Sequence, residues 1–201
     1  MRKFKHGFKT PGFNRGMKEK VIRKLSNLEK GWIAGCIDSD GSITILKVPT
    51  PPILHYKRRY VIQTWIKFSN TNRDVVQKFR DVIGAGQIVQ TNLDPKGTTL
   101  YYTWTLYPKY AIKSLLLQIK DILIVKKERA LLMLQFCESR IKHLQEGPRA
   151  KREYSDEEIA ILKRFRELNE KKGVLEMKRK MGDINATPDN KQAITIIKNS
   201  V

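Results

Sequence analysis

The chain has 201 residues, of which 40 are Lys or Arg and 20 are Asp or Glu, so its formal charge is +20. That length supports one core domain with extensions and little more. Such an excess of positive charge favours a polyanionic partner, and nucleic acid is the leading candidate. The alternative, an anionic membrane, fits poorly with 30% charged residues and a mean hydropathy of −0.47. No stretch reaches the run of about 18 apolar residues that a spanning helix needs.

Cysteine and histidine usage excludes several other classes. Cys36 and Cys137 are too few for a disulfide framework and form no CxxC pair, and the three histidines lack metal-ligand spacing. A zinc enzyme and a histidine-based triad are therefore disfavoured. A reducing intracellular compartment fits best, with the prokaryotic cytoplasm favoured over an organelle.

The positive charge is concentrated at the amino terminus. Residues 1–30 carry ten basic and two acidic side chains, which is +8 of the total, and Phe4, Phe8 and Phe13 interrupt the lysines. We expect residues 1–24 to form a basic arm that lies on phosphates, with a solvated tail as the alternative.

The remaining sequence predicts elements in a clear order. A helix is expected over 25–37, capped by Ser26 or Asn27, and strands over 42–48 and 58–68 flank a proline-rich loop. An amphipathic helix then ends at Gly84, and strands over 87–93 and 98–107 form a hairpin around a turn at 94–97. Helices are expected from Pro108 to 119 and over 128–144, and a capping box at 155–158 begins a helix to about 172.

This order, α-β-β-α-β-β-α followed by further helices, predicts an α+β fold. The sheet is expected to be antiparallel, with helices on one face and the other face open to water or a partner. The predicted organisation is a basic arm over 1–24, a core over 25–147 and a helical extension over 148–201.

The most informative stretch is Trp32 to Ile43, WIAGCIDSDGSI. Two carboxylates lie where a helix should end and a strand begin, and Gly41 is expected to take a left-handed or otherwise strained turn there. Gly31 and Gly35 each cost the helix about 1 kcal/mol, which a tight helix–helix contact would offset. By itself, the sequence DSDG is a common turn signal. A calcium-binding loop that began at Asp38 would need a bidentate Glu at its twelfth position, but that position is Pro49, so such a loop is excluded.

Residues 33–41, IAGCIDSDG, resemble the nine-residue LAGLIDADG motif, from which they depart at Ile33, Cys36 and Ser39. The order of elements over 31–145 also resembles that of the LAGLIDADG homing endonucleases. The resemblance implies a saddle-shaped antiparallel sheet that lies in the DNA major groove. One copy of the motif implies a homodimer of the single-motif type, which would cut a long pseudo-palindromic site in double-stranded DNA.

The resemblance also implies an intron-homing enzyme that hydrolyses phosphodiester bonds with Mg²⁺ or another divalent cation such as Mn²⁺. Two other functions of the same fold stay open. One is an RNA-binding intron maturase, and the other is a non-catalytic DNA-binding regulator.

Site residues follow from the same resemblance. It places the metal on Asp40 and the backbone carbonyl of Ser39, and assigns catalytic roles to Asn70, Lys126 and Arg73. Asn70 could instead cap the next helix, and Lys126 could be an ordinary solvated helix start. The dimer interface is expected to contain part of the first helix, namely Gly31, Trp32, Ala34, Gly35 and Asp38, with a structural role for Asp38.

Strand alternation predicts which sheet residues read bases. If Ile43, Ile45, Ile62, Ile66, Ile88, Tyr102 and Trp104 point inward, the opposite set points out. The residues expected to contact DNA are Thr44, Leu46, Arg58, Arg59, Gln63, Trp65, Lys67, Gln87, Thr103 and Thr105. Trp65 could instead belong to the core.

Overall fold

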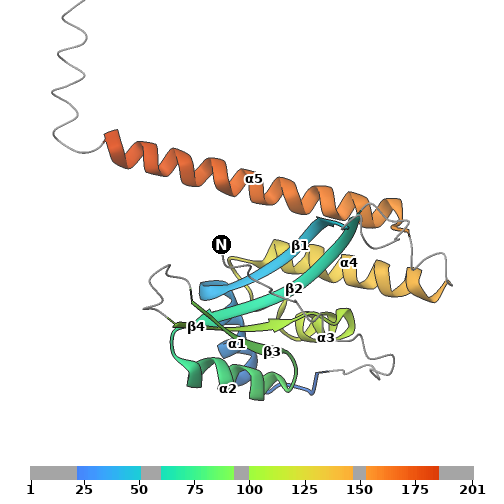
Figure 1. Ribbon diagram of the computed structural model, residues 1–201, viewed down its shortest axis with the longest axis horizontal. Coiled ribbons are helices and arrows are strands. Elements are labelled where there is room, and N and C mark those ends of the chain that lie inside the picture. The colour runs from blue at the N-terminus through green and yellow to red at the C-terminus, as the bar shows by residue number, and fades with distance from the viewer. Residues whose placement is uncertain (1–21, 51–59, 93–99, 147–152, 186–201) are drawn as a thin grey trace, which may run out of the picture.

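The computed structural model describes residues 22–50, 60–92, 100–146 and 153–185. The described helices are α1 (Asn27–Asp40), α2 (Arg73–Ile83), α3 (Lys109–Ile119), α4 (Lys127–Gln145) and α5 (Asp156–Asn185). The strands are β1 (Gly41–Pro49), β2 (Tyr60–Asn70), β3 (Gln87–Asn92) and β4 (Leu100–Leu106). They form one antiparallel sheet in the order β1-β2-β4-β3 (Figure 1), which confirms the predicted α+β fold.

Local capping explains where the helices begin. Ser26 caps α1 in a capping box with Glu29, and Asn72 accepts hydrogen bonds from the first turn of α2. Gly84 ends α2 in the left-handed conformation at φ 74°, as the sequence predicts. Helix α5 continues to Asn185, beyond its predicted end near 172, even though Gly173 and Gly182 lie within it.

The helices that precede α5 cover one face of the sheet, where the core is packed. Phe79 of α2 lies at its centre, with its ring centroid 4.5 Å from that of Phe68 and 4.9 Å from that of Trp104. The alternation predicted for the inner face is confirmed. Of that set, Ile43, Ile45, Ile62, Ile66 and Trp104 are buried, and Ile88 and Tyr102 are half-buried against the core.

None of the helices in the described ranges combines the length and the apolar character needed to cross a membrane. Helix α5 is the longest, and it is too polar for such a role.

Replacing Gly86 should be costly for the fold. Its φ is 100°, and an added Cβ would overlap the indole ring of Trp104, which donates a hydrogen bond from Nε1 to the carbonyl of Ala85 at 2.8 Å. We expect Gly86→Ala to lower the free energy of unfolding by about 2–4 kcal/mol in urea titrations. Gly84→Ala is the matched control: its φ is also positive, but no described atom lies within 4 Å of the added Cβ, so a loss of only about 1 kcal/mol is expected. Equal losses in the two variants would refute the steric explanation.

Candidate active site and nucleic-acid interface

The motif lies where α1 passes directly into β1. Gly41 has a φ of −83°, so the expectation of a left-handed or strained turn was wrong. Glycine is required there for space, because an added Cβ would lie 2.6 Å from the Cα of Ile37. The close passage of the chain at Gly41 brings both motif carboxylates to the end of the sheet where β1 begins and β2 ends.

Asp38 is committed to the structure of its own chain. Its two carboxylate oxygens accept hydrogen bonds from the backbone N–H groups of Ile124, at 2.7 Å, and Lys126, at 2.9 Å. These bonds fasten the segment between α3 and α4 to the end of α1. Asp38 therefore has a structural role within its own protomer, and its place at the dimer interface stays a prediction.

Lys126 binds the carboxyl end of α1. Its side chain is 7% exposed, and Nζ donates to the carbonyls of Ile37 and Asp38 at 2.6 Å each and of Ser39 at 3.3 Å. A helix C-terminus carries partial negative charge that acids aggravate and a cation offsets. Because Lys126 is buried against these carbonyls, the alternative of a solvated helix start was wrong.

Removing the Asp38 carboxylate should destabilise the fold. Asp38→Ala leaves two backbone N–H groups without their acceptor, for which we expect a loss of about 1.5–3 kcal/mol in the free energy of unfolding. Asp40→Ala is the control. It removes a neighbouring exposed charge from the same unfavourable helix end, so stability should stay constant or rise by up to about 0.5 kcal/mol. An Asp38→Ala protein as stable as Asp40→Ala would contradict the role assigned to Asp38.

Unlike the Asp38 carboxylate, the Asp40 carboxylate is available to bind a ligand. Its side chain is exposed, and within the described part of the chain no hydrogen bond or ion pair engages its carboxylate. A free carboxylate at a helix end suits a hard divalent cation such as Mg²⁺, which takes one or two carboxylates and completes its shell with water and phosphate oxygens. The donor set of one protomer is incomplete without such oxygens, since the described residues contain no group of three or more His, Cys, Asp or Glu side chains able to hold a metal.

The Ser39 carbonyl suits a metal less well than Asp40 does. It already accepts a hydrogen bond from Lys126, so a cation bound there would lie beside an ammonium group. Cys36, in the same turn of α1, has a pKa raised by burial and by the negative charge of Asp40. The thiol therefore stays neutral at physiological pH and is not a nucleophile.

Asn70 and Arg73 lie at the same end of the sheet as the motif, because β1 begins opposite the end of β2. The Asn70 side-chain oxygen accepts a hydrogen bond from the backbone N–H of Asn72 at 2.8 Å, and Asn72 caps α2. The alternative role of Asn70 as the cap was therefore off by two residues. Arg73 is exposed at the first position of α2, without a hydrogen bond or ion pair among the described residues.

The other face of the sheet carries the residues predicted to read bases. Cross-strand pairing places Thr44 opposite Trp65, Leu46 opposite Gln63, and Thr105 between Lys67 and Gln87. Trp65 is half-buried on this outer face, with Lys67 Nζ 5.0 Å from its ring, so the alternative of a core tryptophan was wrong.

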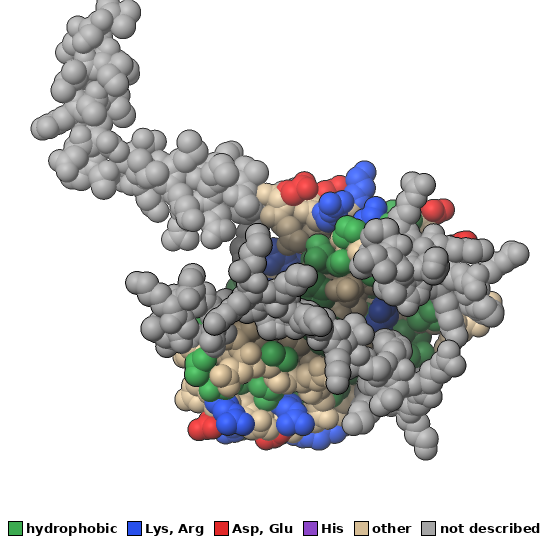
Figure 2. Space-filling model, viewed as in Figure 1, with side chains coloured by type: hydrophobic (Ala, Val, Ile, Leu, Met, Phe, Trp, Pro, Cys, Tyr) green, Lys and Arg blue, Asp and Glu red, His purple; other side chains and the backbone are tan. Residues whose placement is uncertain are grey.

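Two details of the outer face differ from expectation or lie beyond the structure. Thr105 has the predicted direction but is only 4% exposed, because it is short and lies between two longer side chains. Arg58 and Arg59, like residues 1–21 of the arm predicted over 1–24, lie outside the described residues. In Figure 2 basic side chains gather at the lower edge of the molecule, over α2 in the view of Figure 1.

One face of α1 is open along its length. Among the described residues, no atom lies within 4 Å of a Cβ added at Gly31 or Gly35, and Leu28, one turn earlier on the same face, is 85% exposed. Beside the end of α1, Ile124 and Val125 are 85% and 69% exposed. These five residues, Leu28, Gly31, Gly35, Ile124 and Val125, define what we call the open face of α1.

Two residues predicted for the dimer interface pack within their own protomer. Ala34 is 2% exposed and belongs to the core of its own protomer. Trp32 is half-buried. Its ring centroid lies 5.7 Å from that of Phe79 and 5.9 Å from Lys78 Nζ.

Solved structures with the same arrangement were found. The chain is similar to the homing endonuclease I-CvuI in complex with its target in the presence of Ca, with a TM-score of 0.52, 17% identity, and coverage of 67% of this chain and 80% of that one. It is similar to the archaeal intron-encoded homing endonuclease I-Vdi141I complexed with DNA, with a TM-score of 0.54, 15% identity, and coverage of 70% and 83%. For the group I intron-encoded I-CeuI, also complexed with DNA, the values are 0.55, 11%, 71% and 68%.

The chain has the fold of the LAGLIDADG homing endonucleases. No model of a known protein family matches the sequence, and no curated protein does either. The likeness therefore rests on the fold and on the nine-residue motif.

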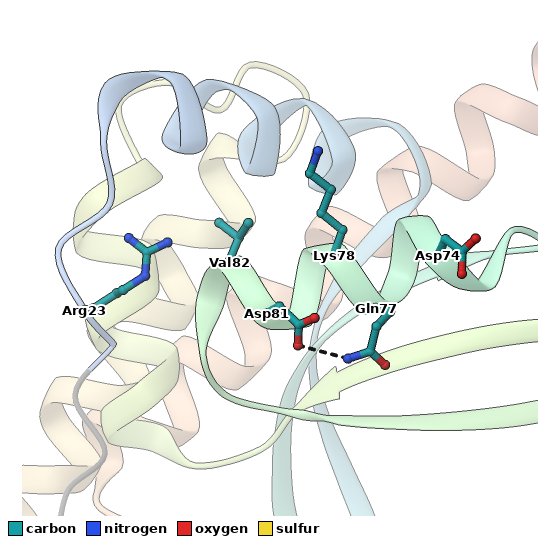
Figure 3. A pocket seen from close by; sticks show the side chains of 6 residues that line it. All are labelled: Arg23, Asp74, Gln77, Lys78, Asp81 and Val82. Atoms are coloured by element: carbon teal, nitrogen blue, oxygen red, sulfur yellow. Dashed lines mark hydrogen bonds between the residues drawn. The ribbon is translucent and has the colours of Figure 1, made fainter.

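This homing-endonuclease fold also carries a depression away from the motif (Figure 3). It is lined by Arg23, Asp74, Gln77, Lys78, Asp81 and Val82, with a volume of about 450 Å³. Gln77 donates to Asp81 at 2.9 Å, and the side chains of Asp74, Lys78 and Arg23 point in different directions (Figure 3). Because no set of polar groups converges in it, the depression is a poor site for chemistry.

Sequence reasoning missed three residues of the open face. The sequence patterns do not single out Leu28, Ile124 or Val125. A signal existed for the latter pair, because two branched apolar residues in a short connection between helices are unusual for a loop exposed to water.

Proposed function

We propose that the chain is a homing endonuclease that cuts both strands of a long pseudo-palindromic DNA site by metal-dependent hydrolysis. The observation that carries this proposal is the division of labour between the two motif acids. Asp38 is occupied by two backbone N–H groups, whereas Asp40, at the end of α1, is exposed and has no partner among the described residues. A carboxylate kept free at a helix C-terminus, where its charge is unfavourable, is expected of a functional group.

The chemistry assigned to this site is phosphodiester hydrolysis. A divalent cation held there supplies a nucleophilic water and neutralises charge on the phosphate. Asp40 would hold the cation, Arg73 can pair with a phosphate from the start of α2, and Lys126 fixes the end of α1 so that Asp40 is rigidly placed. Asn70 uses its side-chain oxygen to shape the turn before α2, which leaves its amide group to orient water.

The open face of α1 supports a homodimer. Two glycines on a helix cost stability, and no atom of the described residues lies within 4 Å of a Cβ added at either one. A second copy of the same face would bury Leu28, Ile124 and Val125 and bring two Asp40 carboxylates near the centre of the site. An isologous dimer of this kind reads two equivalent half-sites, which fits a pseudo-palindrome.

The outer face of the sheet is the surface proposed to read bases. Gln63 and Gln87 can pair with base edges, Thr44, Thr103 and Leu46 can contact thymine methyl groups, and Lys67 can reach guanine or phosphate. These residues are polar or only modestly apolar, and they lie on the face that the helices leave uncovered.

A comparison of two activities tests the proposal. The wild-type protein is incubated with Mg²⁺ and DNA that joins the two sequences flanking the gene, and separately with the unspliced intron RNA. We expect a double-strand break in the DNA. Stimulated splicing with intact DNA would instead favour a maturase, and binding without either activity would favour a regulator.

A further inference from the structure

The segment that leads into α5 is bonded to the first residues of β2 by Tyr154. The Tyr154 hydroxyl accepts a hydrogen bond from the backbone N–H of Ile62 at 2.7 Å. Strand β4 pairs with β2 only from Ile66 to Asn70, so the N–H of Ile62 lies beyond the end of that ladder. The hydroxyl satisfies a backbone donor at the point where the neighbouring strand is missing.

Aromatic and cationic side chains reinforce this bond. The rings of Tyr154 and Tyr60 are stacked, with centroids 5.8 Å apart and planes 12° apart. Each ring also carries a cation: Lys47 Nζ lies 3.9 Å from the Tyr60 centroid, and the Arg140 guanidinium carbon lies 4.6 Å from that of Tyr154. Residues from β1, β2, α4 and the start of the C-terminal extension therefore meet at one point.

The far side of this contact is fixed by a buried network. Arg140 is 4% exposed, and its Nη1 donates to the carbonyl of Glu153 at 2.6 Å and lies 3.4 Å from Glu158 Oε2. Glu158 is fully buried and also closes the capping box of α5, accepting from the N–H of Ser155 at 2.7 Å. Because Arg140 and Glu158 are buried and paired, Tyr154 is held on a rigid support and not on a mobile tail.

The same end of the β1–β2 pair presents two candidate base readers on the outer face, one on each strand. Gln63 follows Ile62 directly and is paired with Leu46 of β1, and both side chains are exposed. Base recognition depends on placing a side chain within a few tenths of an ångström, so a hairpin end without a neighbouring strand needs another support. Tyr154 provides that support (Figure 1 shows α5 crossing this end of β1 and β2).

We infer that Tyr154 is a positioning residue for specificity. By bonding the N–H of Ile62, it fixes the β1–β2 hairpin against the C-terminal extension and thereby sets discrimination at the base pairs read by Gln63 and Leu46. This inference rests on the proposed function, in which the outer face of the sheet reads DNA.

The test compares Tyr154→Phe with Tyr110→Phe. The first variant loses only the hydroxyl and keeps the ring stack, and the second alters a half-buried tyrosine of α3 that has no hydrogen bond among the described residues. Amide exchange is measured at Ile62, and binding and cleavage are measured on a panel of sites with single base substitutions. Competition binding measures base discrimination independently of cleavage. If the wild-type protein binds selectively but does not cut, the proposed cleavage is refuted, and the effect of Tyr154→Phe on binding selectivity can still be measured.

In Tyr154→Phe we expect faster exchange at Ile62 and unchanged exchange in the core. Discrimination should fall about three- to tenfold at the base pairs where Gln63→Ala and Leu46→Ala also reduce it. It should stay unchanged at base pairs that depend on Gln87 of β3, and Tyr110→Phe should behave as wild type. An unchanged panel in Tyr154→Phe, or an equal loss at every base pair, would overturn the inference.

Discussion

Asp40→Asn should abolish cleavage and leave DNA binding nearly intact. Asparagine keeps the shape of the side chain but not its charge, and a neutral amide is a poor ligand for Mg²⁺. Metal-ion catalysis supplies several kcal/mol of transition-state stabilisation, so a loss of at least about a hundredfold in the cleavage rate is expected. Binding should change by less than about threefold, because phosphate and base contacts elsewhere provide the affinity.

The matched control for this prediction is Asp156→Asn, which removes an exposed carboxylate from the first turn of α5. It should cut at the wild-type rate. Because Asp40 has no partner in the described structure, Asp40→Asn should also unfold at the same urea concentration as wild type or slightly above it. Normal cutting by Asp40→Asn would remove Asp40 from the active site.

Gly35→Leu should separate the two protomers without harming either. In the part of the protomer that the structure describes, no atom lies within 4 Å of a Cβ added at Gly35, and leucine is a better helix former than glycine by about 0.8 kcal/mol. The stability of the protomer should therefore hold or rise. Across the proposed dimer, by contrast, the added side chain would push two closely approaching helices apart.

Sedimentation measures this second prediction. We expect the dimer dissociation constant to increase at least about tenfold and cleavage to fall with it, while the variant remains folded. Gln135→Leu adds the same side chain to an exposed position of α4 and should leave the dimer unchanged. A wild-type protein that stays monomeric at micromolar concentration, alone and on DNA, would refute the interface on α1.

The elements were predictable because their signals are local. Ser26 with Glu29, Asn72 and Gly84 mark helix ends by backbone hydrogen bonding alone, and alternation along β2 specifies its two faces. The order of strands in the sheet, the extension of α5 past Gly173 and the burial of Thr105 depend on packing between distant segments, which no local pattern encodes.

In the candidate site, too, the residue types were predictable from the local sequence, whereas their contacts with distant segments were not. The motif identifies Asp40 and Asp38 as a pair, but only the fold shows that Asp38 binds the backbone at 124 and 126, 86 and 88 residues further along the chain. Lys126 was predicted from a resemblance, yet its burial on the carbonyls of α1 follows from how α4 begins beside that helix end. Tyr154 had no sequence signal at all, because its partner is a backbone group on β2.

We propose that this chain breaks DNA at a defined site with the help of a metal held by Asp40. The most direct measurement maps, to the nucleotide, the breaks in both strands of DNA that joins the two flanks of the gene, with Mg²⁺ and with a chelator. We predict one break in each strand, close together on either side of the pseudo-two-fold centre, and none in the chelator. Intact DNA in Mg²⁺, at protein concentrations where the site is fully bound, would contradict the account.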